Sequence, residues 1–146
     1  MPYADLIFAE EYFANRAYTD NWQKAAETDK QRLLGMATNL IETYCQFYDD
    51  NGFPFLYTIE GAPHWLKQAT CEQAIYLLNL GFDPTQPPEP TVLGIASAKG
   101  TVFDKSMVAD ILCQSCRRII EANGGEVDSA AYSGSSGSIA NGTIEK

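Results

Sequence analysis

The segment from Pro63 to Gly81 constrains the fold of this chain more than any other feature of its sequence. Proline suits the first position of a helix, because the N–H that it lacks would have no intrahelical partner there. Glycine is favoured just beyond a helix C-terminus. Between them, apolar residues such as Leu66, Ile75 and Leu77 fall on more than one side of the helix. We therefore expect helix 63–81 to be either central in the fold or covered by a neighbouring subunit.

Two more helices are predicted upstream from the spacing of apolar residues. The first spans residues 6–16. The second starts after Thr28, because Gln31 lies three positions later in a capping-box arrangement, and it ends at the turn residues 49–52. Its apolar stripe follows the 3.6-residue period through Leu33, Ala37, Leu40, Ile41, Tyr44 and Tyr48. This stripe predicts one long helix that reaches Tyr48.

Two shorter helical segments complete this prediction. A helical turn is expected around residues 21–26, with Asp20 as its cap and Trp22 pointing inward. A last helix is expected to start near Asp104 or Ser106 and to end at Gly124-Gly125. The stripe of this last helix is formed by Val108, Ile111, Leu112, Ser115 and Ile119.

Residues 82–104 read as a linker and arm inserted before the last helix. Four prolines between residues 83 and 90 disfavour a helix and favour extended backbone. Residues 92–103 are rich in β-prone side chains around Lys99-Gly100, which suggests a short hairpin or an extended arm. The sequence therefore predicts a mainly α fold, a small bundle of about four helices with a short β-prone arm.

The last 24 residues differ in composition from the rest. Residues 123–146 are rich in Ser, Gly, Ala and Asn, with only scattered apolar side chains. Such a segment buries too little apolar surface to offset the entropy lost on ordering. We expect a single helical domain over residues 1–122 and an extended Gly/Ser-rich C-terminal tail over 123–146 that becomes ordered only on assembly.

Charge and composition narrow the classes of function. The chain of 146 residues has 19 acidic and 10 basic residues, a formal net charge of −9. Tight nucleic-acid binding by one subunit is disfavoured, because phosphate contacts need clustered cations. We expect no secretory signal and no membrane span. Four cysteines without a signal favour free thiols and synthesis in a reducing cytoplasm.

Candidate reactive residues are few. His64 is the only histidine and lacks a nucleophile motif nearby, so we interpret it as a boundary side chain at a helix start. Cys113 and Cys116 form a single C-x-x-C pair, which alone is a weak signal for metal or redox chemistry. We expect this pair well inside the last helix, whereas redox pairs lie at helix N-termini. We therefore predict no catalytic residue, no metal and no cofactor.

An aromatic run follows the second predicted helix. Phe53, Phe55 and Tyr57 could stack single-stranded bases, but no basic residue lies between Gln46 and Ala62. Packing in the core or against another subunit is the better interpretation. The residues that we predict for a subunit or portal interface are Phe53, Phe55, Tyr57, Val127, Tyr132, Ile139 and Ile144.

The order of the short motifs resembles a phage family. The motifs are Ala9-Glu-Glu-Tyr-Phe-Ala-Asn-Arg16, Trp22, Arg32-Leu-Leu-Gly-Met-Ala-Thr38, Pro63-x-Trp-Leu-Lys-Gln-Ala-Thr-Cys-Glu-Gln-Ala74 and Ile95-Ala-Ser-Ala-Lys-Gly-Thr-Val-Phe-Asp104. Over residues 3–123 the chain is similar to the small head-tail connector, or adaptor, proteins of long-tailed bacteriophages. Some relatives in that family carry a DnaT-like single-stranded-DNA-binding label.

This resemblance implies a non-enzymatic virion protein. It implies a homo-oligomeric ring, a dodecamer matching the portal, located at the neck between head and tail. The partners would be the portal protein and a tail or neck (stopper) protein, while DNA would pass through the lumen without specific binding. The alternative is a replication accessory protein that binds single-stranded DNA.

Overall fold

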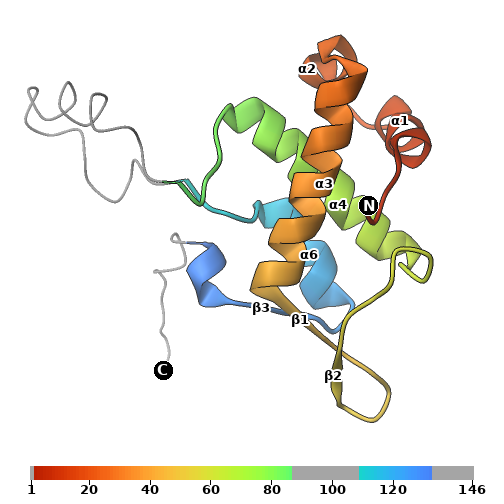
Figure 1. Cartoon of the computed structure of the whole chain (residues 1–146), viewed down its shortest axis with the longest axis vertical. Coiled ribbons are helices and arrows are strands. Elements are labelled where there is room, and N and C mark those ends of the chain that lie inside the picture. The colour runs from red at the N-terminus through yellow and green to blue at the C-terminus, as the bar shows by residue number, and fades with distance from the viewer. Residues whose placement is uncertain (1, 87–108, 133–146) are drawn as a thin grey trace, which may run out of the picture.

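The computed structural model describes residues 2–86 and 109–132 (Figure 1). Its helices are α1 (Leu6–Ala14), α2 (Asp20–Lys24), α3 (Glu27–Tyr44), α4 (His64–Leu80), α6 (Gln114–Ala122) and the 3₁₀ helix η2 (Ser129–Ala131). Its strands are β1 (Cys45–Tyr48), β2 (Pro54–Phe55) and β3 (Glu126–Val127). The expectation of a mainly helical bundle is confirmed. The expected arm falls largely within 87–108, outside the described residues.

Helix α4 lies at the centre of the bundle, which is one of the two positions that its apolar residues allowed. It packs against α3 and α6 and also contacts α1 and α2. Nine of its seventeen residues are buried, on several sides of the helix. Pro63 is the N-cap residue, and Gly81 ends the helix with a left-handed φ of 83°, a conformation in which glycine is unstrained. The predicted bounds of this helix are therefore correct to one residue.

The second predicted helix is wrong at both ends. Helix α3 begins at Glu27 after Ala26, and Thr28 is not its cap. It ends at Tyr44, because the next four residues form strand β1. Residues four apart, such as Tyr44 and Tyr48, fit a helical stripe, but Cys45 and Phe47 are buried whereas Tyr48 is exposed. That alternation is the period of a strand.

The last helix begins ten residues or so later than expected, at Gln114. Tertiary hydrogen bonds hold the preceding backbone in a non-helical path. The side chain of Gln73 donates to the carbonyl oxygen of Ile111 (2.7 Å) and accepts from the N–H of Cys113 (2.9 Å). The N–H groups of Ile111 and Leu112 both donate to the carbonyl oxygen of Ala131 (2.7 and 3.0 Å). Because these backbone groups already have hydrogen-bond partners, they do not require the hydrogen bonds that a helix would supply.

The short turn before α3 is also shifted. Trp22 is fully buried, as predicted, and its ring packs against Phe13 with centroids 4.7 Å apart. Asp20 is the first residue of α2 and does not cap it, since the cap position belongs to Thr19. The difference of one residue leaves the inward direction of the tryptophan unchanged.

The first part of the predicted tail folds against the helices. Strand β3 pairs antiparallel with β1, joining Cys45 to Val127, and β1 pairs with β2 in the order β2-β1-β3. Ala131 is fully buried. We expected order in this region only on assembly. Residues 124–132 are instead held within one chain by backbone pairing and by the Ala131 carbonyl. Residues 133–146 lie outside the described part.

Candidate subunit interface

A hairpin formed by β1, β2 and the turn between them projects away from the helices (Figure 1). The Asp49 carboxylate accepts hydrogen bonds from the N–H groups of Asn51 and Phe53, both at 2.9 Å. The N–H of Asp49 donates to the carbonyl oxygen of Phe53 (2.9 Å), and Gly52 has a φ of 84°. These bonds organise the turn before any partner is present.

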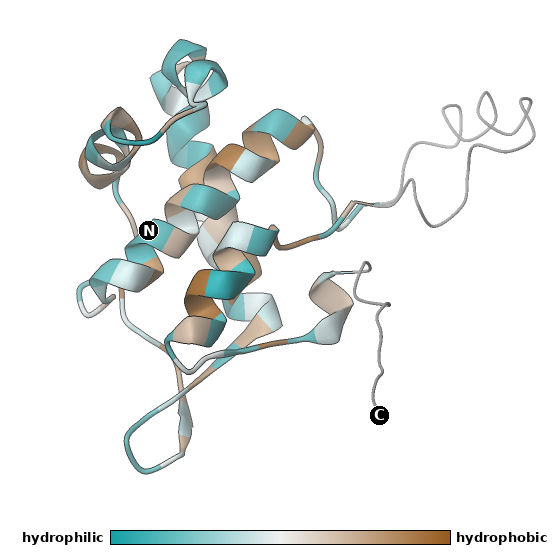
Figure 2. Cartoon of the chain, turned by 180° about the vertical axis from the view of Figure 1, so that it is seen from behind, coloured by the Kyte–Doolittle hydropathy of each residue, from teal (hydrophilic) through white to brown (hydrophobic). Residues whose placement is uncertain are grey.

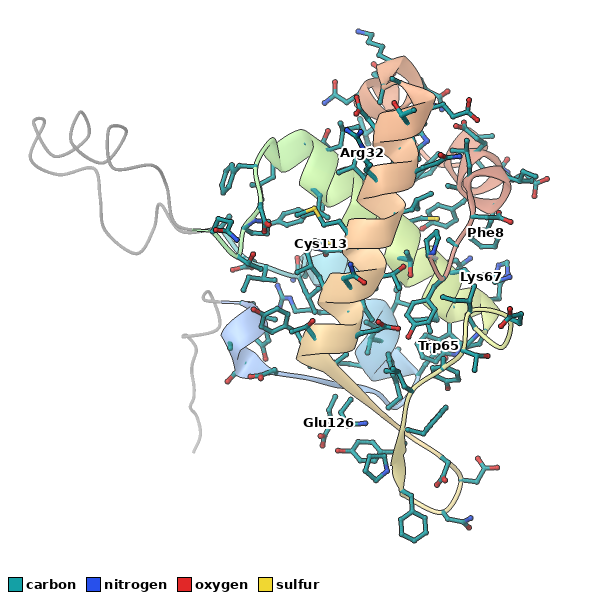
Figure 3. All side chains as sticks on the ribbon, viewed as in Figure 1. Phe8, Arg32, Trp65, Lys67, Cys113 and Glu126 are labelled. Atoms are coloured by element: carbon teal, nitrogen blue, oxygen red, sulfur yellow. The ribbon has the colours of Figure 1, made fainter. Side chains whose placement is uncertain are left out.

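The base of the hairpin is fixed by an aromatic cluster. Tyr57 lies at the centre of this cluster, with ring centroids 4.6 Å from Phe55, 5.2 Å from Phe47 and 5.8 Å from Trp65. Figure 3 shows Trp65 where α4 meets the hairpin. Phe55 and Tyr57, two of the predicted interface residues, are therefore partly buried against their own subunit.

The end of the hairpin leaves apolar side chains in solvent. Phe53 is 65 % exposed, Leu56 55 % and Tyr48 38 %. Figure 2 shows the turn itself as hydrophilic, which reflects Asp49, Asp50 and Asn51. Leu56 lies towards the base of the hairpin, beyond the pairing of Phe47 with Phe55, and the Tyr48 hydroxyl donates to the Glu126 carboxylate (2.8 Å). We therefore call Phe53 together with the turn residues 49–52 the hairpin tip. Exposed apolar residues rimmed by charge are typical of protein interfaces, so an interface at Phe53 stays a prediction.

The two described tail residues of the predicted interface lie on the body of the subunit. Val127 is partly buried in the pairing of β3 with β1. The Tyr132 ring lies 4.2 Å from the guanidinium of Arg117, a cation–π contact. Ile139 and Ile144 lie outside the described residues.

An apolar groove between α3 and the end of α4 was not predicted from the sequence. Its volume is about 390 Å³, and its apolar lining is formed by Leu33, Met36, Leu77, Leu78 and Phe82. Arg32, Asp29 and Asp83 are the charged residues around it. The Asp83 carboxylate already accepts from the N–H and the hydroxyl of Thr85 (2.9 and 2.6 Å). The exposed Phe82, directly after Gly81, was the available sequence signal for this groove.

The C-x-x-C pair lies at a helix N-terminus, which corrects the expected position inside the last helix. Cys113 is the N-cap residue of α6, and its sulfur accepts from the N–H of Cys116 (3.4 Å). Burial nevertheless raises the pKa of Cys113 to about 11, and burial also raises the pKa of Cys116. Low-pKa thiolates are the reactive form of cysteine, so this environment favours two neutral, unreactive thiols.

The most polar buried cluster surrounds Glu72 of α4. Its carboxylate accepts from Arg16 at Nε (2.7 Å) and at a terminal guanidinium nitrogen (2.9 Å), and from the Tyr12 hydroxyl. Burial, together with the hydrogen bond to Glu72, raises the pKa of Tyr12. Every member of this cluster has a partner, which is the arrangement of a structural tie between α1 and α4.

The remaining reactive candidate, His64, packs its ring edge-on against Phe8 with centroids 5.3 Å apart. It lines a pocket of about 440 Å³ with Tyr12, Arg16 and Gln68. Within residues 2–86 and 109–132, no group of three or more His, Cys, Asp or Glu side chains is arranged to hold a metal ion. In the same part of the chain, no helix combines the length and apolar character needed to span a membrane.

Comparisons with protein families, with curated proteins and with solved structures find no match to this chain.

Proposed function

We propose that this chain is a non-enzymatic structural protein of a tailed bacteriophage, a head-to-tail connector subunit that acts as one copy in a dodecameric ring beneath the portal. The observation that carries the proposal is the order of sequence motifs over residues 3–123, which resembles the connector family. The hydrogen-bonded hairpin with the exposed Phe53 at its tip gives additional support, because a ring subunit must present surfaces to its neighbours.

The chemistry of the described residues agrees with this role. The thiols of the C-x-x-C pair are buried with raised pKa values, and the Glu72 carboxylate is fully engaged by Arg16 and Tyr12. What the chain offers to a partner is packing surface. The net charge of −9 further suggests that the ring would repel the phosphates of DNA in its lumen, so that the genome slides through.

The second candidate is a single-stranded-DNA-binding replication protein. A stacking platform needs exposed aromatic rings and nearby cations. Phe47 is only 2 % exposed, Phe55 packs against Tyr57, and Tyr57 packs against Trp65. These observations favour the connector.

Inactivating the gene in its phage separates the two candidates. For a connector, DNA replication and packaging proceed and full heads without tails accumulate. For a replication protein, phage DNA synthesis falls before any particle forms. Mass spectrometry of purified virions adds a second measurement. A fixed copy number at the neck supports the connector, and the absence of the chain from virions would refute it.

A further inference from the structure

The hairpin tip contains an asparagine followed by a glycine, a dipeptide with a chemistry of its own. The side-chain carbonyl carbon of an asparagine can be attacked by the backbone nitrogen of the next residue, and glycine leaves that nitrogen unhindered because it has no Cβ atom. The sequence contains the pairs Asn51-Gly52, Asn123-Gly124 and Asn141-Gly142. The last pair lies outside the described residues, whereas the first two can be compared in the structure.

The side chain of Asn51 is free to react, but the nitrogen of Gly52 is not. Asn51 is exposed, and in the described part of the chain its side-chain amide makes no hydrogen bond. The N–H of Gly52 donates to the carbonyl oxygen of Asp49 (2.9 Å). This bond must break before the nitrogen can reach the Asn51 amide. The hairpin tip therefore has to open locally before any reaction.

Little structure opposes this opening. Strands β1 and β2 pair at two positions, and one of these is Pro54, which has no N–H to donate. The turn beyond is held through Asp49, whose carboxylate accepts from the N–H groups of Asn51 and Phe53 (both 2.9 Å). Exposed segments with few buried contacts open at the lowest free energies. We therefore expect the tip to open without unfolding of the helices.

The second pair is held more firmly. Asn123 is the C-cap residue of α6, and its side-chain amide donates to the carbonyl oxygen of Ile119 (2.8 Å). The N–H of Gly124 donates to the carbonyl oxygen of Glu121 (3.2 Å). The next residue, Gly125, packs closely against core side chains. Freeing the nitrogen of Gly124 therefore disturbs the end of α6 and the core beside it.

We propose that Asn51 is a site of spontaneous deamidation and that it reacts faster than Asn123 in the folded chain. The Gly52 nitrogen loses its proton to solvent and attacks Cγ of Asn51. The new C–N bond closes a succinimide ring, while the bond from Cγ to Nδ2 breaks and ammonia leaves after gaining a proton from water. A water molecule then opens the ring to give aspartate or isoaspartate. The reaction needs water alone and does not rest on the proposed function.

Either product changes the hairpin tip. Aspartate at position 51 places a third carboxylate next to Asp49 and Asp50. Isoaspartate also adds a carboxylate, and it inserts a methylene group into the backbone of the turn that positions Phe53. The tip of an aged chain is therefore more acidic than that of a newly made chain, and the isoaspartate form loses the geometry of the turn.

Peptide mapping by mass spectrometry tests the site, with the purified full-length chain incubated under mildly alkaline conditions. We expect Asn51 to convert at least about fivefold faster than Asn123, the factor that about one additional net hydrogen bond would give the second site. The same chain in concentrated urea is the control, because both asparagines then react without structure and at similar rates. Equal rates in the folded chain, or the same ratio with and without urea, would overturn the proposal.

Variants of Asp49 test the need for opening of the tip. Asp49→Ala removes the acceptor of two N–H groups, so we expect Asn51 to convert about three- to tenfold faster and Asn123 to be unaffected. Asp49→Asn is the matched variant, because it removes the charge but keeps an oxygen that can accept both bonds. Its rate should lie nearer that of the unchanged chain than that of Asp49→Ala. An Asp49→Ala chain that reacts at the original rate would refute control by the turn.

Discussion

Glu72 has an unusual environment for a carboxylate, since it is 6 % exposed and bonded to both Arg16 and Tyr12. Removing one partner of a buried ion pair leaves an uncompensated charge, which costs about 3–5 kcal/mol when both groups are buried. The Arg16 side chain is 31 % exposed and regains some hydration. We expect Glu72→Ala to lower the free energy of unfolding by about 2–3 kcal/mol, measured from the urea midpoint at an unchanged slope.

The matched control is Glu11→Ala, which removes an exposed carboxylate from the neighbouring helix α1. Exposed substitutions of this kind usually change stability by less than about 0.5 kcal/mol. A Glu72→Ala chain as stable as Glu11→Ala would show that the cluster does not tie α1 to α4.

The buried thiols make stability depend on pH in a defined direction. Burial raises the pKa of Cys45 to about 12 and of Cys113 to about 11, from 9.0. The unfolded chain therefore releases these protons first, so the stabilisation is complete below pH 9 and is lost between pH 9 and 12. We expect the urea midpoint to fall from pH 8 to pH 10.5. Burial also raises the pKa of Tyr3 and Tyr12, which adds to the decrease at the upper end. A constant midpoint would contradict this assignment.

Single residues differ in how far the sequence predicted their roles. Trp22 and Gly81 were predicted correctly, because a large apolar ring and a helix-ending glycine have strong local preferences. Phe53 was predicted as an interface residue from the lack of nearby cations. Gln73 and Cys113 were not predicted, because the first holds a distant backbone segment and the second caps a helix whose start that segment determines. Contacts so distant in sequence leave no local pattern.

Among the elements, the junction of α6 with β3 requires a residue without a side chain, which is Gly125. A Cβ atom at Gly125 would lie 2.6 Å from Ile120 Cγ2 and 3.2 Å from the Phe47 ring, both in the core. We expect Gly125→Ala to destabilise the chain by about 1–3 kcal/mol, because overpacking forces buried side chains from their rotamers. Thermal or urea unfolding measures this change.

Gly35, within α3, provides the opposite case. A Cβ atom there has no neighbour within 4 Å. We expect Gly35→Ala to stabilise the chain by about 0.5–1 kcal/mol, because glycine is a poor helix former. If Gly125→Ala and Gly35→Ala shift the free energy of unfolding in the same direction, close packing is not the cause of the change seen for Gly125→Ala.

The elements also show which local signals were sufficient to predict a helix and which were not. Helix α4 was predicted from its bounding Pro63 and Gly81, which act locally. The end of α3 was missed because Tyr44 and Tyr48 satisfy the helical spacing, whereas the burial of Cys45 and Phe47 follows the strand period. The three-stranded sheet was missed for a different reason, since its strands are only four, two and two residues long. So few residues define no clear period.

At the scale of the whole molecule, the groove could not be predicted because it combines residues from α3, α4 and the turn at Gly81. The hairpin tip, in contrast, is continuous in sequence, so Phe53 could be named as a candidate interface residue from the sequence. Only the beginning of the tail, up to Tyr132, differs from the prediction, because composition alone suggests that Gly- and Ser-rich segments stay unfolded. The pairing of Val127, the burial of Ala131 and the contact of Tyr132 with Arg117 hold this beginning against the helices.

Two truncations test that conclusion. A chain that ends at Tyr132 retains every contact described here, and we expect its urea midpoint to match that of the full chain. A chain that ends at Gly124 loses the pairing of β3 and the bonds from Ile111 and Leu112 to Ala131. At about 1 kcal/mol for each hydrogen bond, we expect a loss of at least about 2 kcal/mol. Equal midpoints for the two chains would contradict the folded position of residues 125–132.

The bonds from Ile111 and Leu112 to Ala131 have a practical consequence. They hold the backbone before α6 beside η2, near the C-terminal end of the described residues. Figures 1 and 2 show η2 on the side of the folded body away from the hairpin. A fluorophore or affinity tag joined after Tyr132 would therefore start at a distance from the hairpin and leave Phe53 exposed.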